Sequence, residues 1–467
     1  MNTVNLNHMQ RKNSFYLMAI TFVAALGGLL FGFDMAVISG VLPFVQDQFA
    51  LSPFEEGWFV SSALIGCIIG VGFSGELSDR FGRKKMLWLS AILFLLSALG
   101  TCLAPGLTLL ILARMLGGVG VGVASNVAPL YISEIAPAKI RGRLVTFYQL
   151  AITVGILVAY LSNSALHSYA IAHQDSAGSG IGSYVFVQEA WRGMFGIGII
   201  PSLLFMGGLF LVPESPRWLL LRNRGQEAVQ ILSRISGEEA ARSDVAAIRS
   251  TLGQERGSYK DLFSPGMRKA MLIGILLPLF SQFSGINAVI YYGPRILNEA
   301  GFELSNALLS QIILGAANMI FTLLAMWKVD QLGRRPLYLV GTAGAVISLF
   351  FTGLCFYLGA TSSIFLLLSV LTFLACFAFS IGPLKFVIAS EIFPNKIRGR
   401  ALAISIMTMW VADTLVGQLT PVSLQVAGTA ATFWIFALCC LIAFWVVYKL
   451  VPETKGKTLE EIQEIWK

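Results

Sequence analysis

The segment SEIAPAKIRGR at residues 133–143 recurs as SEIFPNKIRGR at residues 390–400, with nine of the eleven positions identical. A second pair, GELSDRFGRKK at 75–85 and KVDQLGRRP at 328–336, shows the same relation at a similar separation. Two similar separations indicate that the chain consists of two homologous halves. Duplicated halves are typical of secondary transporters, in which the substrate site lies between the halves near the middle of the membrane.

The composition favours a membrane protein. Hydrophobic residues make up 56% of the 467 residues and charged residues only 12%, whereas soluble domains carry about 25% charged residues. Apolar stretches of about 20 residues cross a bilayer as helices. We therefore predict an all-α membrane protein with twelve transmembrane helices in two six-helix halves. The predicted spans are 15–40, 57–77, 86–104, 108–132, 144–166, 192–212, 268–297, 306–328, 336–358, 364–390, 401–424 and 430–450.

These spans define the domain organisation. The N-terminal half covers residues 1–212 and the C-terminal half covers residues 268–450. Between them lies a polar linker, 213–267, and a short tail follows at 451–467. The apolar spacing in the linker predicts short surface helices, one of them near residues 226–235.

Loop charge predicts the orientation, because cytoplasmic loops of membrane proteins carry an excess of Lys and Arg. One set of loops holds most of the cations, and the other set is nearly free of them. We expect both termini and the linker to be cytoplasmic, in the inner membrane of a bacterium, and the lipid bilayer to be the surrounding partner. The net charge of +8 is then explained by topology and not by nucleic-acid binding. The cation-rich loops contain Arg80, Arg83, Lys84, Lys85, Arg141, Arg143, Arg334, Arg335, Arg398 and Arg400.

No pattern predicts enzyme chemistry. The six cysteines lie in apolar segments without CxxC spacing, and the three histidines (His8, His167 and His173) fall outside the predicted spans. No phosphate-binding loop, GxSxG motif or metal-ligand cluster occurs. We expect no catalytic site, no metal and no cofactor.

A set of motifs resembles the sugar porter family of the major facilitator superfamily over nearly the whole chain. Within that family the chain is similar to bacterial sugar:proton symporters of the xylose, galactose and arabinose type. The resemblance implies the major facilitator fold, import of a monosaccharide or polyol by proton symport with alternating access, and a monomer. The motifs are GGLLFGFDMAVISG (27–40), GELSDRFGRKK (75–85), RMLGGVGVG (114–122), PLYISEIAPAKIRGR (129–143), PESPRWL (213–219), QFSGINAVIYY (282–292), VDQLGRRPL (329–337), SEIFPNKIRGRALA (390–403) and PETKGKTLEEI (452–462).

Asp34 and Arg114 are the predicted proton-coupling residues. Both lie inside predicted spans, where an ionisable side chain costs about 2.5–3.5 kcal/mol and is usually functional. Burial disfavours the charged form of a carboxyl group and a nearby cation favours it, so such a group can gain and lose a proton as its surroundings change. The resemblance implies that Asp34 couples proton movement and pairs with Arg114. A static ion pair that joins spans one and four is the alternative.

Lys385 and Asp413 are a second pair of charges inside predicted spans. Lys385 follows Gly382-Pro383, where we expect the tenth helix to be broken. The related transporters usually have neutral residues at both positions. We expect the two side chains to pair with each other; alternatively, one of them binds substrate or carries a second proton.

The candidate substrate-binding residues offer amide groups for sugar hydroxyls and aromatic faces for ring carbons. Interhelical hydrogen bonding is the alternative role for the polar ones. The family often has a second Gln where Ser281 stands and a Trp where Phe386 stands. The candidates are Gln149, Gln282, Asn287, Tyr291, Tyr292, Asn318, Phe386 and Trp410.

Charged residues repeat at the cytoplasmic ends of the helices in both halves. They predict a cytoplasmic gate of salt bridges that joins the halves while the outside is open. These residues are Asp79, Arg83, Glu134, Arg141, Glu214, Arg217, Asp330, Arg334, Glu391, Arg398 and Glu453.

Two alternatives to sugar:proton symport stay open at this point. One is a proton-independent sugar facilitator, in which Asp34 is structural. The other is a transporter of a charged sugar derivative or another organic solute, which Lys385 and Asp413 would favour.

Overall fold

The computed structural model describes residues 2–137, 140–176, 178, 180–252, 259–264, 266–360, 364–394 and 397–455. Every regular element assigned within these ranges is helical. In the N-terminal half these are α1 (Asn2–Phe49), α2 (Pro53–Phe81), α3 (Arg83–Leu103), α4 (Leu107–Ile135), α5 (Arg141–Ala172), η1 (Gln174–Ser176), α6 (Ile181–Ser183), η2 (Tyr184–Gln188), α7 (Ala190–Gly196) and α8 (Ile199–Gly208).

The described residues of the linker form four short helices: α9 (Pro216–Leu221), α10 (Gly225–Ser236), α11 (Glu238–Leu252) and α12 (Tyr259–Leu262). The predicted linker helix is thus confirmed as α10. The C-terminal half contains α13 (Arg268–Phe283), α14 (Ile286–Glu299), α15 (Leu304–Leu332), α16 (Arg334–Tyr357), α17 (Ile364–Cys376), η3 (Phe377–Ile381), α18 (Gly382–Ile392), α19 (Arg398–Val426) and α20 (Gly428–Leu450).

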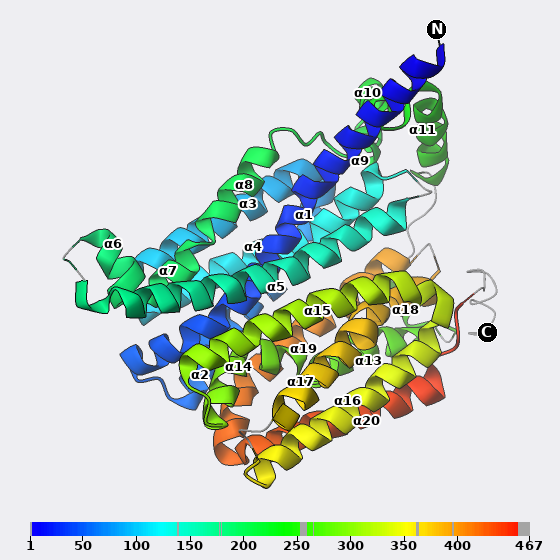
Figure 1. Ribbon diagram of the computed structural model, residues 1–467. Coiled ribbons are helices and arrows are strands. Elements are labelled where there is room, and N and C mark those ends of the chain that lie inside the picture. The colour runs from blue at the N-terminus through cyan, green and yellow to red at the C-terminus, as the bar shows by residue number, and fades with distance from the viewer. Residues whose placement is uncertain are drawn as a thin grey trace.

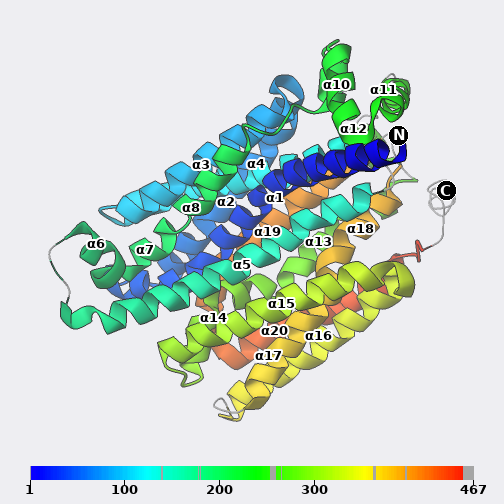
Figure 2. The same cartoon turned by 45° about the horizontal axis from the view of Figure 1, so that its top comes forward.

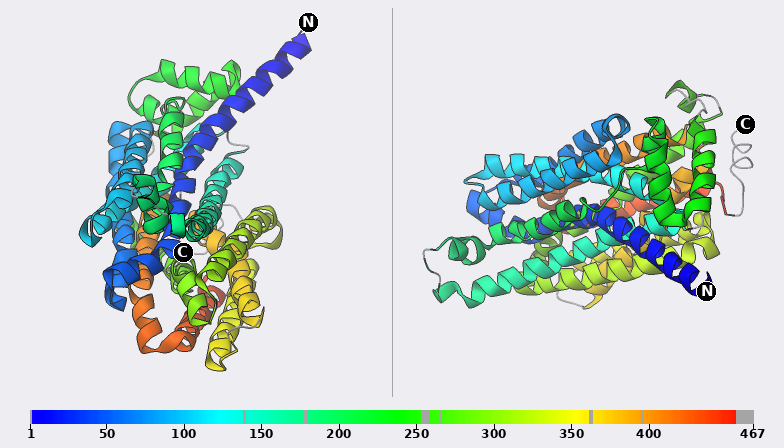
Figure 3. Two further views of the ribbon diagram at one scale, coloured as in Figure 1. Left: turned by 60° about the vertical axis from the view of Figure 1, so that its left-hand side comes forward. Right: turned by 90° about the horizontal axis from the view of Figure 1, so that it is seen from above.

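Twelve helical spans among the described residues are long and apolar enough to cross a membrane. Three of them combine consecutive elements: α7 with α8, α13 with α14, and α17 with η3 and α18. The helices of the two halves form two neighbouring bundles (Figure 1). The chain start and helices α10 and α11 lie at one end of the molecule, and α6 lies at the other (Figures 2 and 3). This arrangement is the predicted all-α architecture.

Two helices extend further than the sequence suggested. The first continues to Phe49, so that Asp47 lies within α1 and not in a loop. The fifth continues to Ala172, which places His167 inside the span, contrary to our expectation for the histidines. In α1 the helix continues through Pro43.

Two other spans are interrupted differently from the prediction. The seventh span, predicted as continuous, breaks between α13 and α14 at Gly285, whose φ of 82° is left-handed. The tenth span, predicted to break at Gly382-Pro383, instead contains the π-helical turn η3 and then continues as α18. Pro383 stands in the first turn of α18, where a proline is tolerated because its missing N–H has no helical partner to bond.

Glycines allow close packing of α2 on α4. A Cβ atom at Gly122 would come into contact with the backbone oxygen of Cys67, and a Cβ atom at Gly70 would meet that of Val119. Small residues four positions apart let two transmembrane helices approach closely. Arg114 therefore stands on one of two closely packed helices.

Candidate functional site

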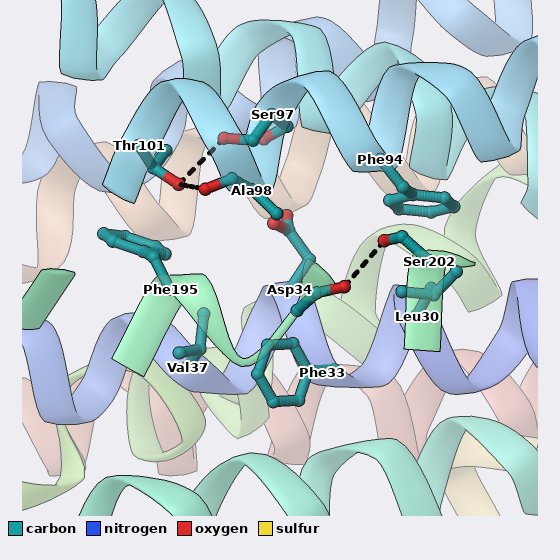
Figure 4. Close-up of a pocket in the computed structure, with 11 residues that line it drawn as sticks. Leu30, Phe33, Asp34, Val37, Phe94, Ser97, Ala98, Thr101, Phe195 and Ser202 are labelled. Atoms are coloured by element: carbon teal, nitrogen blue, oxygen red, sulfur yellow. Dashed lines mark hydrogen bonds between the residues drawn. The ribbon is translucent and has the colours of Figure 1, made fainter. Parts of the chain in front are cut away.

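Asp34 lies on α1 beside a pocket between α1, α3 and the α7–α8 segment. The pocket is lined by Phe33, Ser97, Phe195 and Ser202 among others. Figure 4 shows the Asp34 side chain among these residues. Its Oδ2 atom is buried and has no hydrogen-bond partner among the described residues. A buried carboxyl oxygen without a partner is costly unless the group takes up a proton or finds a partner in another conformation.

Arg114 on α4 is also buried, with 2% of its surface exposed. Its guanidinium group lies 5.4 Å from the ring centre of Phe59 and 5.5 Å from that of Phe195. The Nε and Nη1 atoms have no hydrogen-bond partner in the described part of the chain. Cation–π contacts therefore surround this charge.

Asp34 and Arg114 are neighbours but form no ion pair within 4.0 Å among the described residues, so the expected direct pair is absent from this conformation. A Cβ atom added at Gly117, three residues beyond Arg114, would lie 3.4 Å from Asp34 Oδ1. The two charges thus lie in one region of the bundle. Asp34 borders the pocket, and Arg114 lies against the rings of Phe59 and Phe195.

Lys385 and Asp413 are both buried in the C-terminal half. Our prediction that they pair with each other is wrong for this conformation, because each has a different partner. Lys385 Nζ on α18 donates to Ser281 Oγ on α13 at 2.9 Å. Asp413 Oδ2 on α19 accepts from Tyr291 Oη on α14 at 3.2 Å. Asp413 Oδ1 has no partner among the described residues.

The amide candidates Gln282 and Asn287 flank the break in the seventh span. Asn287 Nδ2 donates to Gln282 Oε1 at 3.0 Å across Gly285. Since Ser281 and Tyr291 stand on the same two helices, the break brings the amide pair next to both buried charges. The sequence did not identify Ser281 as a member of this cluster.

The aromatic candidates Trp410, Phe386 and Tyr292, also in the C-terminal half, make contacts of their own. Trp410 on α19 is buried, and its ring centre lies 5.4 Å from that of Phe31 on α1. Lys385 Nζ lies 5.3 Å from the ring centre of Phe386. Tyr292 Oη donates to the Gly417 carbonyl at 2.6 Å, which gives it a partner within the C-terminal half.

Gln149 and Asn318 lie outside this cluster. Gln149 is exposed on α5, and Asn318 is partly buried on α15. Neither makes a hydrogen bond with the described residues. Their amide groups are free to meet a solute, but the structure does not bring them into contact with the C-terminal cluster.

Most of the residues predicted to form a cytoplasmic gate lie in two clusters, one within each half, and the gate that joins the halves stays a prediction. In the N-terminal half Arg83 Nε donates to Glu134 Oε2 at 2.9 Å, and Arg83 Nη2 lies 3.0 Å from Asp79 Oδ1. Ser215 Oγ donates to Glu134 Oε2 at 2.5 Å. Glu214 Oε1 accepts from the backbone N–H groups of Arg83 and Lys84.

The C-terminal half repeats these contacts at the corresponding positions. Arg334 Nη2 lies 3.1 Å from Glu391 Oε1, and Thr454 Oγ1 donates to Glu391 Oε2 at 2.5 Å. Glu453 accepts from the backbone N–H groups of Arg334 and Arg335. The internal repeat of the sequence is thus a repeat of side-chain contacts.

Three other predicted gate residues differ from this pattern. Arg141 and Arg217 are exposed and form no ion pair with the described residues. Arg398 donates to the Phe393 carbonyl and not to Glu391. The side chain of Asp330 lies outside the part of the chain whose side chains are described.

Several polar contacts join the two halves at the end of the molecule away from α10 and α11. Arg295 on α14 forms an ion pair with Glu56 on α2, although neither residue was among our candidates. Gln418 on α19 accepts from Ser61 Oγ and donates to the Phe54 carbonyl, both on α2. The halves therefore meet on the predicted outer side. In the sequence, the only indication of the Glu56–Arg295 contact was that opposite charges stand near the ends of two predicted helices.

An all-α chain with two pseudo-symmetric bundles, buried charges at mid-span and repeated charge clusters at one end has the architecture of a secondary transporter. A family model described as "Sugar (and other) transporter" matches residues 20–466. The arabinose-proton symporter of Bacillus subtilis is 42% identical over 453 residues, covering 97% of this chain and 95% of that protein. The D-xylose-proton symporter of Escherichia coli K12 is 41% identical over 488 residues, covering 97% and 96%.

Solved structures are similar as well. The xylose transporter XylE from E. coli, in a partially occluded inward-open conformation, matches with a TM-score of 0.82 and 39% identity, covering 95% of this chain and all of that one. The chain belongs to the sugar transporter family and is a multi-pass membrane transporter of the major facilitator superfamily, not an enzyme.

Proposed function

We propose that this chain imports a neutral monosaccharide or a related polyol together with a proton. The observation that carries the proposal is the buried, unpartnered carboxyl oxygen of Asp34 near Arg114. The relatives named as proton symporters of arabinose and xylose support the same assignment.

In the proposed cycle, Asp34 takes up a proton when its pocket faces the outside. Protonation removes the attraction between Asp34 and Arg114, and the guanidinium group then rests against Phe59 and Phe195, as in this structure. Release of the proton to the inside restores the attraction. The proton therefore biases the conformation only through its different affinity for Asp34 in the two states.

The sugar binds between the halves in this proposal. The amide groups of Gln282 and Asn287 and the ring of Trp410 contribute from the C-terminal half, and Gln149 and Asn318 contribute from α5 and α15. Amides both donate and accept hydrogen bonds, which matches the hydroxyl groups of a sugar. Tyr291, Tyr292 and Phe386 are further proposed contacts of the sugar.

Alternating access follows from the two sets of contacts at opposite ends. In the outward-facing state the cytoplasmic clusters of the two halves meet, and the Glu56–Arg295 contact separates. We infer that both termini are cytoplasmic, that the membrane is a bacterial inner membrane, and that one chain forms the complete pathway as a monomer.

The experiment is uptake of radiolabelled D-xylose, L-arabinose, D-galactose and myo-inositol into proteoliposomes. Wild type, Asp34→Asn and the control Asp175→Asn, which changes an exposed outer residue, are compared with and without an inward proton gradient. We expect wild type and the control to accumulate at least one of the four solutes only with the gradient. Asp34→Asn should exchange that solute without concentrating it, because the neutral amide cannot take up and release a proton.

Two results would contradict this proposal. If wild type only equilibrates the solute, with or without the gradient, the chain is a proton-independent facilitator. If none of the four solutes moves, the substrate class is wrong.

A further inference from the structure

Lys385 and Asp413 have no role in the cycle described so far, although placing each charge in the membrane is costly. A direct ion pair would reduce that cost most simply. The two side chains do not form one within the described residues: Lys385 bonds Ser281, and one oxygen of Asp413 bonds Tyr291. This arrangement leaves hydrogen-bonding capacity on both charges.

The unused hydrogen-bonding capacity consists of donors on Lys385 and an acceptor on Asp413. A lysine ammonium group has three donors, and the described residues accept only one hydrogen bond from Lys385. A carboxylate accepts several hydrogen bonds and donates none, and Asp413 Oδ1 is buried without a partner in the described chain. The indole Nε1 of Trp410, one turn before Asp413, is an additional unpartnered donor among these residues.

The position of the two charges relates them to the proposed sugar site. The hydroxyl partner of Lys385, Ser281, immediately precedes Gln282. The partner of Asp413, Tyr291, stands one helical turn beyond Asn287 on α14. Both charges therefore adjoin the Gln282–Asn287 amide pair from two other helices, α18 and α19.

A ligand that satisfies both charges must accept a hydrogen bond from Lys385 and donate one to Asp413. Two neighbouring hydroxyl groups of one sugar ring can do so, since each hydroxyl both donates and accepts. Hydrogen bonds to charged groups are stronger than those between neutral groups. The pair can thus bind hydroxyl groups more strongly than neutral side chains would.

The combined charge of the pair decides the class of ligand. Lys385 and Asp413 sum to zero, so a neutral solute meets no net repulsion. A carboxylate solute attracted to Lys385 would be repelled by Asp413, and it would also lose its hydration on entry. An ammonium solute would be attracted to Asp413 and repelled by Lys385.

We propose that Lys385 and Asp413 form a hydroxyl-binding pair that selects a neutral sugar with two adjacent hydroxyl groups and rejects its carboxylate and ammonium derivatives. This inference rests on the proposed sugar transport at the same site. It makes the two residues determinants of specificity and not a second route for protons.

The test measures equilibrium binding to the purified chain in lipid nanodiscs by isothermal titration calorimetry. The probes are D-xylose, D-galactose, D-galacturonate and D-galactosamine, and the variants are Lys385→Met, Asp413→Asn and the double variant. Wild type should bind a neutral sugar at least about tenfold more tightly than either charged one. Each variant should lose roughly 10- to 100-fold in affinity for the neutral sugar, the range expected for a hydrogen bond to a charge.

The direction of the change in selectivity separates this role from a structural one. Asp413→Asn should shift preference toward galacturonate, because Lys385 is then unbalanced, and Lys385→Met should shift it toward galactosamine. The double variant removes both charges and should bind the neutral sugar weakly without gaining either charged one, so it tests the idea even if a lone buried charge prevents folding. Unchanged affinity ratios in folded single variants, or a wild type that prefers a charged sugar, would overturn the proposal. If wild type binds none of the four probes, the proposed function fails as well.

Discussion

Glu214 and Glu453 have equivalent structural roles in the two halves. Each carboxylate accepts hydrogen bonds from two backbone N–H groups at the start of a helix, Glu214 at α3 and Glu453 at α16. The first N–H groups of a helix have no partner within the helix and carry partial positive charge, so an anion stabilises them. The preceding glycines, Gly82 and Gly333, have φ values of 103° and 88° that allow this close approach.

Glu453 makes a testable contribution to stability. Partial burial opposes ionisation, but hydrogen bonds from the backbone N–H groups of Lys455, Arg334 and Arg335 outweigh it and lower the pKa of Glu453 below its ordinary value of 4.5. A lowered pKa in the folded state gives stability that is present above pH 4.5 and is lost as the pH falls through the folded value. Glu453→Gln should therefore destabilise the protein at pH 7 by roughly 0.5–1 kcal/mol.

Thermal unfolding of purified protein between pH 3.5 and 7 checks this prediction. The difference in Tm between wild type and Glu453→Gln should shrink as the pH falls below about 4.5, where the unfolded carboxyl group takes up its proton. Glu76→Gln, at an exposed position of α2 away from its first turn, is the control and should leave the Tm unchanged. A Tm difference that is constant over this pH range would rule out the charged cap.

At the scale of single residues, the sequence predicted which residues are unusual but not which side chains are in contact. Asp34, Arg114, Lys385 and Asp413 stand out because ionisable residues are rare in apolar spans. Their partners depend on how each helix is rotated and on where the seventh span breaks. For that reason the predicted Lys385–Asp413 contact was wrong, and Ser281 and Glu56 were missed.

At the scale of helices, α2 and α14 join the two halves on the outer side. Glu56 is fully buried in the first turn of α2, and its partner Arg295 on α14 is 18% exposed. Arg295 Nε also lies 3.4 Å from Oε1 of Glu299, one turn further along α14. Separation of the halves on this side would leave Glu56 without its cation, and removing one partner of a buried ion pair is strongly unfavourable.

We expect Glu56→Gln to favour the outward-facing state by about tenfold or more in the population ratio, because the neutral amide weakens the contact that closes the outer side. The measurement is the distance between spin labels at Asp175→Cys and Gln425→Cys, in a chain whose six native cysteines are replaced. The population of longer distances should increase in this variant.

Arg242→Met is the matched control for this measurement, since it removes an exposed ion pair with Glu238 on α11. It should leave the distances as they are in the parent chain. If Glu56→Gln gives the same distances as the control, the Glu56–Arg295 pair does not hold the outer side closed.

The helices themselves were largely predictable, and their interruptions were not. Apolar length located all twelve spans, because it is a property of a continuous stretch of chain. The break at Gly285 and the π-helical turn Phe377–Ile381 depend on contacts with other helices. A Cβ atom at Gly285, for example, would lie 2.6 Å from Phe436 Cγ on α20.

For the whole molecule, the repeat in the sequence predicted the two-bundle architecture and the duplicated charge clusters. The conformation could not be predicted in this way, because one sequence must adopt at least two states during transport. The contacts on the outer side define the state seen in this structure. A transporter that changes between such states can couple two solutes if each binds the two states with different affinity.

The measurement that tests the central claim most directly is proton movement caused by the sugar itself. Proteoliposomes without a pH gradient are suspended in weakly buffered medium, and the external pH is recorded when the transported sugar is added. Wild type should make the medium more alkaline as sugar and protons enter together. Asp34→Asn should exchange the same sugar without any change in pH. Sugar entry into wild-type proteoliposomes without alkalinisation, or an equal pH change in Asp34→Asn, would contradict proton symport through Asp34.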